Sequence, residues 1–403
     1  MSDAMRILLM EGVHPAGRAL LEDAGFQVEY HDRALEPAEF LEHIGGFHAI
    51  GIRSKTLVTP EVLSRADRLL AVGAFCIGTN QVALDAANHR GIPVFNAPYS
   101  STRSVAELVV AEMIALSRQL GHISHAAHHG LWKKTARRMH EVRGKTVGII
   151  GYGHIGSQVG ILAEAFGMRV VYYDTVKKLP LGNAAPAALL GDLLAQADFV
   201  TLHVPATDET HEMFGAPELA AMKEGAYLLN LSRGTVVQIP ALVDALKRGH
   251  IHGAAIDVFP NEPPSVKDPF ASELQGLDNV ILTPHIGGST EEAQEAIGRE
   301  SAEALMRYLH EGSSGGAVNF PNVELPTRAS AHRLLNVHRN VPGVLSQINR
   351  LVSESGANIL GQYLSTDPEI GYLVMDVETE RDGLRIAEAI RGLEHSIKTR
   401  RLY

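Results

Sequence analysis

A glycine-rich motif between two β-rich runs is the feature that most constrains the fold of this chain. Residues 147–174 read VGIIGYGHIGSQVGILAEAFGMRVVYYD. An apolar run ends at Gly151, the G-x-G-x-x-G pattern continues through Gly153 and Gly156, and a second β-rich run ends at Asp174. This order predicts a strand, a tight turn, a helix and a second strand.

Each part of the motif has a physical role in binding a dinucleotide. Gly151 allows the tight turn, Gly153 lets the backbone approach a pyrophosphate, and Gly156 allows the helix to pack closely on the strand. The carboxylate of Asp174 lies where ribose hydroxyls bind, and its charge would repel a 2′-phosphate. A tight turn without a ligand is the alternative, but the complete βαβ context favours an NAD site.

Composition limits the class of protein. With 403 residues the chain is too long for one core, so two or three domains are expected. A net charge of −10 argues against a nucleic-acid partner. Cys76 is the only cysteine, which excludes an intrachain disulfide and favours a reducing compartment. The sequence shows no signal peptide and no run that could span a membrane, so a cytoplasmic protein is expected.

Short β-rich runs alternate with helical segments over most of the chain, which is typical of parallel α/β layers. The candidate strands besides those of the glycine motif are residues 6–10, 27–30, 49–53, 69–73, 93–95, 199–204, 227–231, 254–258 and 280–282. A long helix is expected from Ser104, which forms a capping-box pattern with Glu107 and would carry the chain between domains. Residues 291–310 are expected to form a second long helix, which would return the chain to the first domain.

The C-terminal part has a different pattern. Residues 312–326 are rich in glycine, serine and proline and are interpreted as a linker. Residues 331–403 then predict the order strand, helix, strand, strand, helix, strand, which is typical of a ferredoxin-like α+β module.

Three polar residues follow strands of the second half. They are Arg233 in AYLLNLSRG, Glu262 in AAIDVFPNEPP and His285 in NVILTPHIGGST. Carboxyl ends of strands line the ligand crevice of an open α/β sheet. Arg233 can bind a carboxylate, and His285 can accept a hydroxyl proton while Glu262 orients the imidazole and raises its pKa. The alternatives are that Arg233 is an ordinary surface charge, that His285 is only a hydrogen-bonded loop residue, and that Glu262 belongs to a solvated turn.

Several segments of the sequence resemble those of a known protein family. The segments GYGHIG, HVPATDET, NLSRGTVV, AAIDVFPNEP and TPHIGGST resemble the D-isomer-specific 2-hydroxyacid dehydrogenases, and the resemblance covers essentially the whole chain. It implies an α/β protein with a doubly wound Rossmann NAD-binding domain, a flavodoxin-like discontinuous substrate domain and a C-terminal ferredoxin-like ACT α+β domain. The expected boundaries are 101–287 for the first, 1–100 with 288–325 for the second, and 326–403 for the third.

The resemblance also implies roles for individual residues. Arg233 would anchor the substrate carboxylate, while His285 and Glu262 would act as the acid/base pair. The residues implied to bind NAD are Gly151, Gly153, His154, Ile155, Gly156, Asp174, Asp257, Gly287 and Gly288.

Within the family, three segments are similar to the bacterial three-domain members that act on 3-phospho-D-glycerate. These are GAFCIGTNQVALDAANHRGIPVFNAP, LPLGN and the C-terminal module. The similarity implies oxidation of 3-phosphoglycerate to 3-phosphohydroxypyruvate with formation of NADH, as the first step of serine biosynthesis.

The phosphate of such a substrate needs cations. Arg53, Ser54 and Lys55 follow the run AIGI and are expected to bind it, although a solvated strand end is the alternative. Lys55 replaces an arginine and Ser101 replaces an asparagine expected from close relatives, so substrate affinity is in question.

Residues 122–140 allow two interpretations. His122, His125 and His129 have helical spacing, but no acidic or cysteine ligand accompanies them, so no metal site is expected. The resemblance implies that Trp132 reaches into a neighbouring subunit of a homotetramer and that Lys134 joins the neighbouring active site. A core position is the alternative for Trp132.

The C-terminal module suggests regulation. His338, Asn340 and Asn358 resemble the serine-binding residues of bacterial relatives, which implies feedback inhibition by L-serine bound between modules of two subunits. Ordinary loop capping is the alternative.

Two other functions stay open at this point. One is oxidation of another 2-hydroxy acid, such as 2-hydroxyglutarate, because cations at the distal pocket would also bind a carboxylate. The other is an NADH-sensing corepressor, in which the fold is a binding scaffold.

Overall fold

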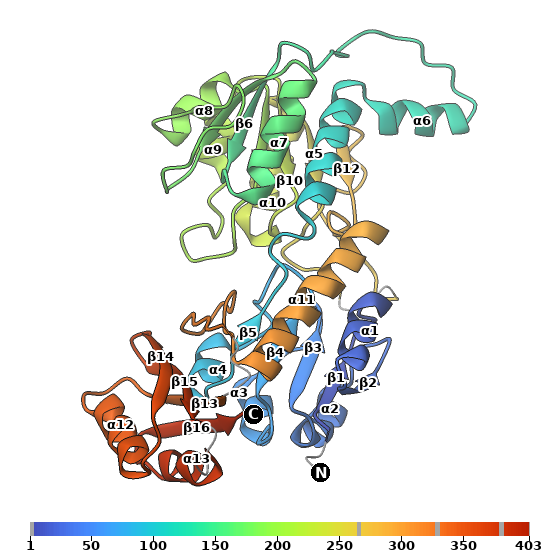
Figure 1. Ribbon diagram of the computed structural model, residues 1–403. Coiled ribbons are helices and arrows are strands. Elements are labelled where there is room, and N and C mark those ends of the chain that lie inside the picture. Colours follow the sequence, from blue (N-terminus) through green and yellow to red (C-terminus); the bar gives the residue numbers. More distant parts are fainter. Residues whose placement is uncertain (1–3, 264–266, 327–330, 379–382, 403) are drawn as a thin grey trace. The chain divides into compact units, whose positions relative to one another are not determined.

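The computed structural model describes residues 4–263, 267–326, 331–378 and 383–402. The chain forms two compact units (Figure 1). Unit 1 comprises Met1–Ser100 with Gln294–Tyr403, and unit 2 comprises Ser101–Ala293. The three-domain division expected from the sequence, with its boundaries, stays a prediction.

Unit 2 is built on a parallel sheet of seven strands in the order β12-β11-β10-β9-β6-β7-β8. The strands are β6 (Thr146–Ile150), β7 (Arg169–Tyr173), β8 (Ala185–Pro186), β9 (Phe199–Leu202), β10 (Ala226–Asn230), β11 (Ile251–Ile256) and β12 (Val280–Leu282). Because the order reverses between β6 and β9, a crevice is expected there at the carboxyl ends of the strands. The prediction of a doubly wound Rossmann sheet is confirmed.

Helices cover both faces of this sheet. They are α5 (Thr102–Ser117), α7 (His154–Ala165), α8 (Leu190–Gln196), α9 (Ala216–Ala221) and α10 (Ile239–Lys247). Unit 2 also contains the short 3₁₀ helix η2 (Gly234–Val236) and α6 (Leu120–His128), which follows α5 and extends away from the sheet (Figure 1). One core contains residues of α5 and α7, and another contains residues of α8, α9 and α10. Two covered faces explain why the central strands are apolar throughout rather than alternating.

The capping box predicted at Ser104 is wrong. The helix begins two residues earlier, at Thr102, and the Ser104 hydroxyl donates to the Gly287 carbonyl at 2.7 Å. Glu107 accepts a hydrogen bond from Arg103 at 2.6 Å. The hydroxyl that was predicted to cap the helix therefore bonds instead to a backbone carbonyl that is distant in the sequence.

Unit 1 contains a parallel sheet in the order β2-β1-β3-β4-β5, the flavodoxin-like order that was expected. Its strands are β1 (Arg6–Leu9), β2 (Gln27–Tyr30), β3 (Ala49–Ile52), β4 (Ala71–Ala74) and β5 (Val94–Phe95). The helices are α1 (Pro15–Asp23), α2 (Pro37–His43), α3 (Pro60–Arg65) and α4 (Leu84–His89), with the 3₁₀ helix η1 (Ile44–Gly46). The long α11 (Glu291–Glu311) packs its C-terminal half into the core of this unit.

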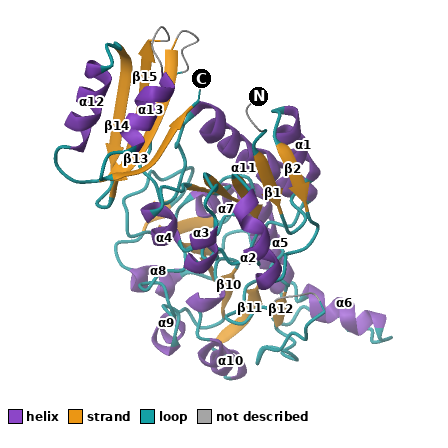
Figure 2. Ribbon diagram, turned by 90° about the horizontal axis from the view of Figure 1, so that it is seen from below, coloured by secondary structure: helices purple, strands orange, loops and turns teal. Residues whose placement is uncertain are grey.

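The ferredoxin-like module is also confirmed. Its antiparallel sheet has the order β14-β15-β13-β16, with two helices beside it (Figure 2). The elements are β13 (Ala331–Arg339), α12 (Val344–Glu354), β14 (Ile359–Thr366), β15 (Ile370–Glu378), α13 (Gly383–Arg391) and β16 (Ser396–Arg401). One face of the sheet packs on α12 and α13, and the other shares a core with α11. The central strands β13 and β15 are therefore buried on both faces.

The interpretation of residues 312–326 as a linker is wrong. Phe320 and Val323 are 6% and 4% exposed and belong to the core that contains α11. Asn319 accepts a hydrogen bond from the backbone of Val94 at 2.8 Å, and Ser314 donates to the carbonyl of Pro321 at 2.6 Å. The glycine, serine and proline content of this segment predicted a linker. Composition does not reveal that the apolar side chains are buried and that the polar side chains have hydrogen-bond partners.

Among the described residues, no helix has the length and apolar character needed to cross a bilayer.

Candidate active site

Glu262 and His285 form a direct pair in unit 2. The Nδ1 atom of His285 lies 2.8 Å from Oε2 of Glu262. Because Nδ1 donates to the carboxylate, the neutral imidazole carries its lone pair on Nε2. The hydrogen bond from His285 to Glu262 raises the pKa of His285. Partial burial favours protonated Glu262, but the hydrogen bond and charge of His285, the Phe259 backbone and the charge of Arg233 together outweigh it and lower the pKa of that carboxyl.

A buried aspartate holds the loop that carries His285. The carboxylate of Asp257, which is 1% exposed, accepts hydrogen bonds from the hydroxyl of Thr283 and from the backbone of Ile286 and Gly287, at 2.7, 2.8 and 2.9 Å. These bonds fix His285 in a left-handed conformation, with φ at 55°. The sequence named Asp257 for NAD and missed this contact, although a carboxylate directly after a buried strand was a usable signal.

Arg233 follows β10 in a turn that Asn230 stabilises. Asn230 is 1% exposed, donates to the Arg233 carbonyl at 2.9 Å and accepts from the Ser232 hydroxyl at 2.8 Å. The Arg233 guanidinium donates to the Ser232 carbonyl at 2.7 Å. Sequence reasoning missed Asn230, whose only signal was a polar residue at the end of the run AYLLN.

Close backbone packing brings the turns of Arg233 and Glu262 together. A Cβ atom at Gly234 would lie 2.0 Å from the carbonyl carbon of Phe259, so only glycine allows this approach. The backbone of Phe259 in turn donates to Oε1 of Glu262 at 3.2 Å. The charge of Arg233 acts on both Glu262 and His285, so the structure brings all three predicted catalytic residues together.

The glycine motif has the geometry that a dinucleotide requires. Gly151 has φ at 89°, and a Cβ there would lie 2.3 Å from the His203 carbonyl oxygen. By contrast, apart from its two chain neighbours no described residue comes within 4 Å of the Cβ position at Gly153, which leaves its backbone open to a ligand. His154 and Ile155 begin α7 directly after it, and a helix N-terminus attracts phosphate.

Asp174 lies beside this turn at the end of β7. Its carboxylate accepts hydrogen bonds from the backbone of Tyr152 and of Val176, both at 2.9 Å. Together with the open backbone at Gly153, the fixed carboxylate fits the pyrophosphate and ribose of NAD. Gly287 and Gly288 follow His285 on the loop held by Asp257.

The predicted phosphate-binding residues lie in unit 1, directly after β3. The carboxylate of Glu11 accepts hydrogen bonds from the backbone of Arg53, Lys55 and Thr56 at 3.1, 2.9 and 2.8 Å. Ser54 and Lys55 are exposed. Glu11 thus shapes the loop, and no sequence pattern indicated this contact. Binding of one substrate by this loop and by the residues of unit 2 stays a prediction.

The segment after α6 exposes its aromatic residue. Trp132 is 91% exposed, which rules out the alternative of a core position, and Lys134 is also exposed. His122 lies 3.5 Å from Asp278, while the rings of His125 and His129 are 4.2 Å apart. No group of three potential metal ligands is found among the described residues.

The predicted serine-binding residues lie at two ends of the C-terminal sheet. His338, which is 3% exposed, pairs with Gly371 at the start of β15. The Asn340 side chain donates to the Asp367 carbonyl at 2.6 Å, just before that strand. Asn358 instead donates to Glu378 at 3.3 Å, at its other end. Seven residues of strand span roughly 20 Å, so one chain does not bring Asn358 to the other two.

Comparison with family descriptions identifies two regions. Residues 110–287 match the family described as D-isomer specific 2-hydroxyacid dehydrogenase, NAD binding domain. Residues 334–398 match a family described as AHAS small subunit-like ACT domain.

Similar proteins match over the full length. The D-3-phosphoglycerate dehydrogenases of Dictyostelium discoideum and Escherichia coli are each 52% identical, over 100% of this chain and 98% of theirs. Among solved structures, a Thermus thermophilus protein has a TM-score of 0.70 and 34% identity over 78% of this chain and 100% of its own. D-lactate dehydrogenase of Aquifex aeolicus, in complex with NAD and lactic acid, has a TM-score of 0.70 and 29% identity, with the same coverage.

Proposed function

The chain belongs to the D-isomer-specific 2-hydroxyacid dehydrogenase family, and from this premise we infer that it oxidises 3-phospho-D-glycerate to 3-phosphohydroxypyruvate with NAD. It is an NAD-dependent oxidoreductase acting at the first step of phosphorylated serine biosynthesis. The observation that carries this conclusion is 52% identity over the whole chain to relatives named D-3-phosphoglycerate dehydrogenase.

The His285–Glu262 pair provides the proton transfer of this reaction. Nε2 of His285 accepts the proton of the C2 hydroxyl as the carbonyl forms, and Glu262 stabilises the resulting imidazolium. Arg233 binds the substrate carboxylate and polarises the neighbouring C2 oxygen. When bound, NAD supplies the acceptor for the hydride that leaves C2.

The cofactor site would use the glycine turn and the carboxylate beside it. The open backbone at Gly153 and the first turn of α7 would hold the pyrophosphate, and Asp174 would hold the adenosine ribose. The loop at Asp257, Gly287 and Gly288 would complete the site.

The other assignments extend this proposal. Arg53, Ser54 and Lys55 would bind the substrate phosphate, and Lys134 of a neighbouring subunit would join them. The exposure of Trp132 supports an interface, and we propose a homotetramer in the cytoplasm. L-serine would inhibit the enzyme by binding His338 and Asn340 of one chain and Asn358 of another.

Initial rates of NADH formation with alternative substrates test the proposal. We expect a larger kcat/KM for 3-phospho-D-glycerate than for D-2-hydroxyglutarate, because a phosphate carries more charge for Arg53 and Lys55 to bind. A preference for 2-hydroxyglutarate would assign the chain to another reaction. Tight NADH binding without turnover of either acid would instead favour a corepressor-like scaffold.

A further inference from the structure

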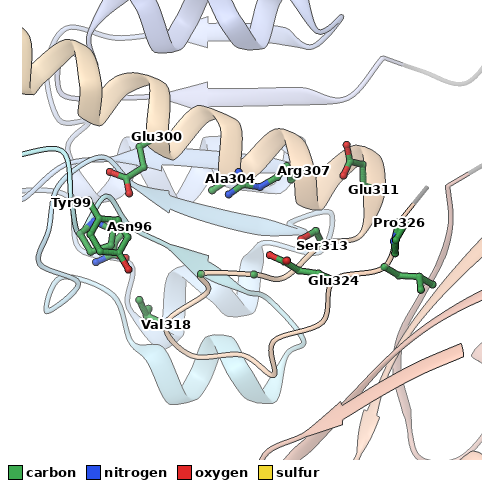
Figure 3. A pocket seen from close by; sticks show the side chains of 14 residues that line it. Asn96, Tyr99, Glu300, Ala304, Arg307, Glu311, Ser313, Val318, Glu324 and Pro326 are labelled. Atoms are coloured by element: carbon green, nitrogen blue, oxygen red, sulfur yellow. The ribbon is translucent and has the colours of Figure 1, made fainter. Parts of the chain in front are cut away.

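One face of α11 lines a pocket in unit 1 (Figure 3). Four residues share this face because they are spaced by four, three and four positions, and all line the pocket: Glu300, Ala304, Arg307 and Glu311. At 1.5 Å per residue, the two glutamates lie roughly 16 Å apart along the helix. The face therefore presents charge at both ends and in the middle.

The opposite wall comes from the segment that follows α11. Ser313, Glu324 and Pro326 line it, Tyr99 lies on the side of Glu300, and Val318 belongs to the rest of the lining (Figure 3). The pocket volume is about 960 Å³, which lies within the range of small-molecule sites. None of these residues belongs to the active site described above.

A serine that lines the pocket offers its hydroxyl to a ligand. Ser313 is only 9% exposed, and it makes no hydrogen bond with any described residue. Its oxygen is not among the buried atoms that lack a partner, so it is open to the pocket and can donate to or accept from a ligand there.

The charges of the pocket are also incompletely paired. Glu300 accepts a hydrogen bond from Ser100 at 2.5 Å. Arg307, Glu311 and Glu324 form no ion pair with any other described residue. The lining thus offers one site for an anionic group and at least two for cationic groups, at separate positions (Figure 3).

We propose that this pocket binds a basic α-amino acid, a zwitterion with a second positive charge on its side chain. The α-carboxylate pairs with Arg307, and the α-ammonium donates to Glu324 and to the hydroxyl of Ser313. The side-chain cation then reaches a glutamate at one end of the α11 face. Such a ligand places an opposite charge beside Arg307, beside Glu324 and beside one glutamate of the α11 face, which a simple diamine or a neutral amino acid does not.

The far wall of the pocket is fixed to the C-terminal sheet. The buried guanidinium of Arg333 donates to the carbonyls of Glu311, Leu325 and Pro326 at 3.0, 3.0 and 2.6 Å. It also forms a bidentate ion pair with Asp376, with both distances at 2.8 Å. This wall is therefore held in place before a ligand binds.

Calorimetry of the full chain with three probes tests the proposal. L-lysine carries all three charges, L-norleucine lacks the side-chain ammonium, and cadaverine lacks the carboxylate. We expect L-lysine to bind once per chain in the presence of saturating NADH, and each of the other two to bind at least about tenfold more weakly. Equal affinity for norleucine and lysine, or no lysine binding at millimolar concentration, would overturn the proposal.

Variants locate the binding site. Arg307→Gln should weaken lysine binding about tenfold or more without weakening cadaverine, because it removes only the partner of the carboxylate. Glu324→Gln should weaken both probes. Glu303→Gln is the matched control, since Glu303 is exposed on the same helix and does not line the pocket. An equal loss of affinity in Glu303→Gln would show general charge attraction and contradict a built site.

Discussion

His285 donates its Nδ1 proton to Glu262 and adopts a left-handed backbone conformation that Asp257 maintains. The strain of this conformation is offset by three hydrogen bonds to one buried carboxylate. The chemistry of the histidine therefore depends on two acidic neighbours with different tasks. Glu262 sets its protonation, and Asp257 sets its position.

The pH dependence of turnover tests the role of Glu262. As the proposed base, His285 has to be neutral for oxidation, so we expect the rate to rise as the pH passes the pKa of the imidazole, which Glu262 raises. Glu262→Gln keeps a hydrogen-bond acceptor but removes the charge, so the rise in kcat/KM should shift to lower pH. The pH profile of both proteins checks this. An unshifted profile would mean that Glu262 does not control the proton on His285.

Glu112 provides a second prediction at the scale of a residue. Both carboxyl oxygens are buried without a described partner, and burial, with a contribution from the charge of Asp257, raises the pKa of Glu112 to about 8. At pH values between the pKa of Glu112 in the unfolded state and its pKa in the native state, the native state binds one more proton than the unfolded state. The free energy of unfolding therefore falls as pH rises, by up to about 1.4 kcal/mol per pH unit.

Glu112→Gln should remove this contribution. Urea unfolding of both proteins at several pH values from 5 to 8 measures the slope. The wild type should lose more stability than the variant over this interval. Parallel curves would show that Glu112 is ionised in the native protein.

At the scale of elements, the sequence predicts most strands and helices because their apolar runs are bounded by clear turns. The glycine motif even predicts the turn at Gly151, since no other residue fits its backbone. Tertiary contacts cannot be predicted this way. The hydrogen bond from Ser104 to Gly287 joins residues distant in sequence, and the segment around Phe320 is ordered by burial that its composition does not reveal.

The βαβ unit gives a prediction about the cofactor. Asp174→Ala removes a charge that would repel a 2′-phosphate and a hydrogen-bond acceptor for the ribose. NAD binding should weaken, and the ratio of NAD to NADP affinity should fall. Fluorescence titration with NADH and NADPH measures both. If the ratio stayed the same, another residue would select the cofactor.

At the scale of the whole molecule, the separation of Asn358 from His338 and Asn340 suggests that regulation requires two chains. The double variant His338→Ala with Asn358→Ala should abolish inhibition by L-serine and leave uninhibited turnover nearly unchanged. Inhibition curves for the wild type and the variant check this. Full inhibition in the variant, or no serine binding to the wild type, would refute the assignment.

The most direct test of the proposed enzyme is the initial rate of NADH formation from 3-phospho-D-glycerate and NAD, compared between the wild type and His285→Ala. We expect turnover by the wild type and a rate lower by roughly 10² to 10⁴-fold in the variant, because proton transfer from the C2 hydroxyl loses its proposed base. NADH binding should be largely kept. Near-normal turnover in His285→Ala, or no NADH from the wild type, would contradict the account.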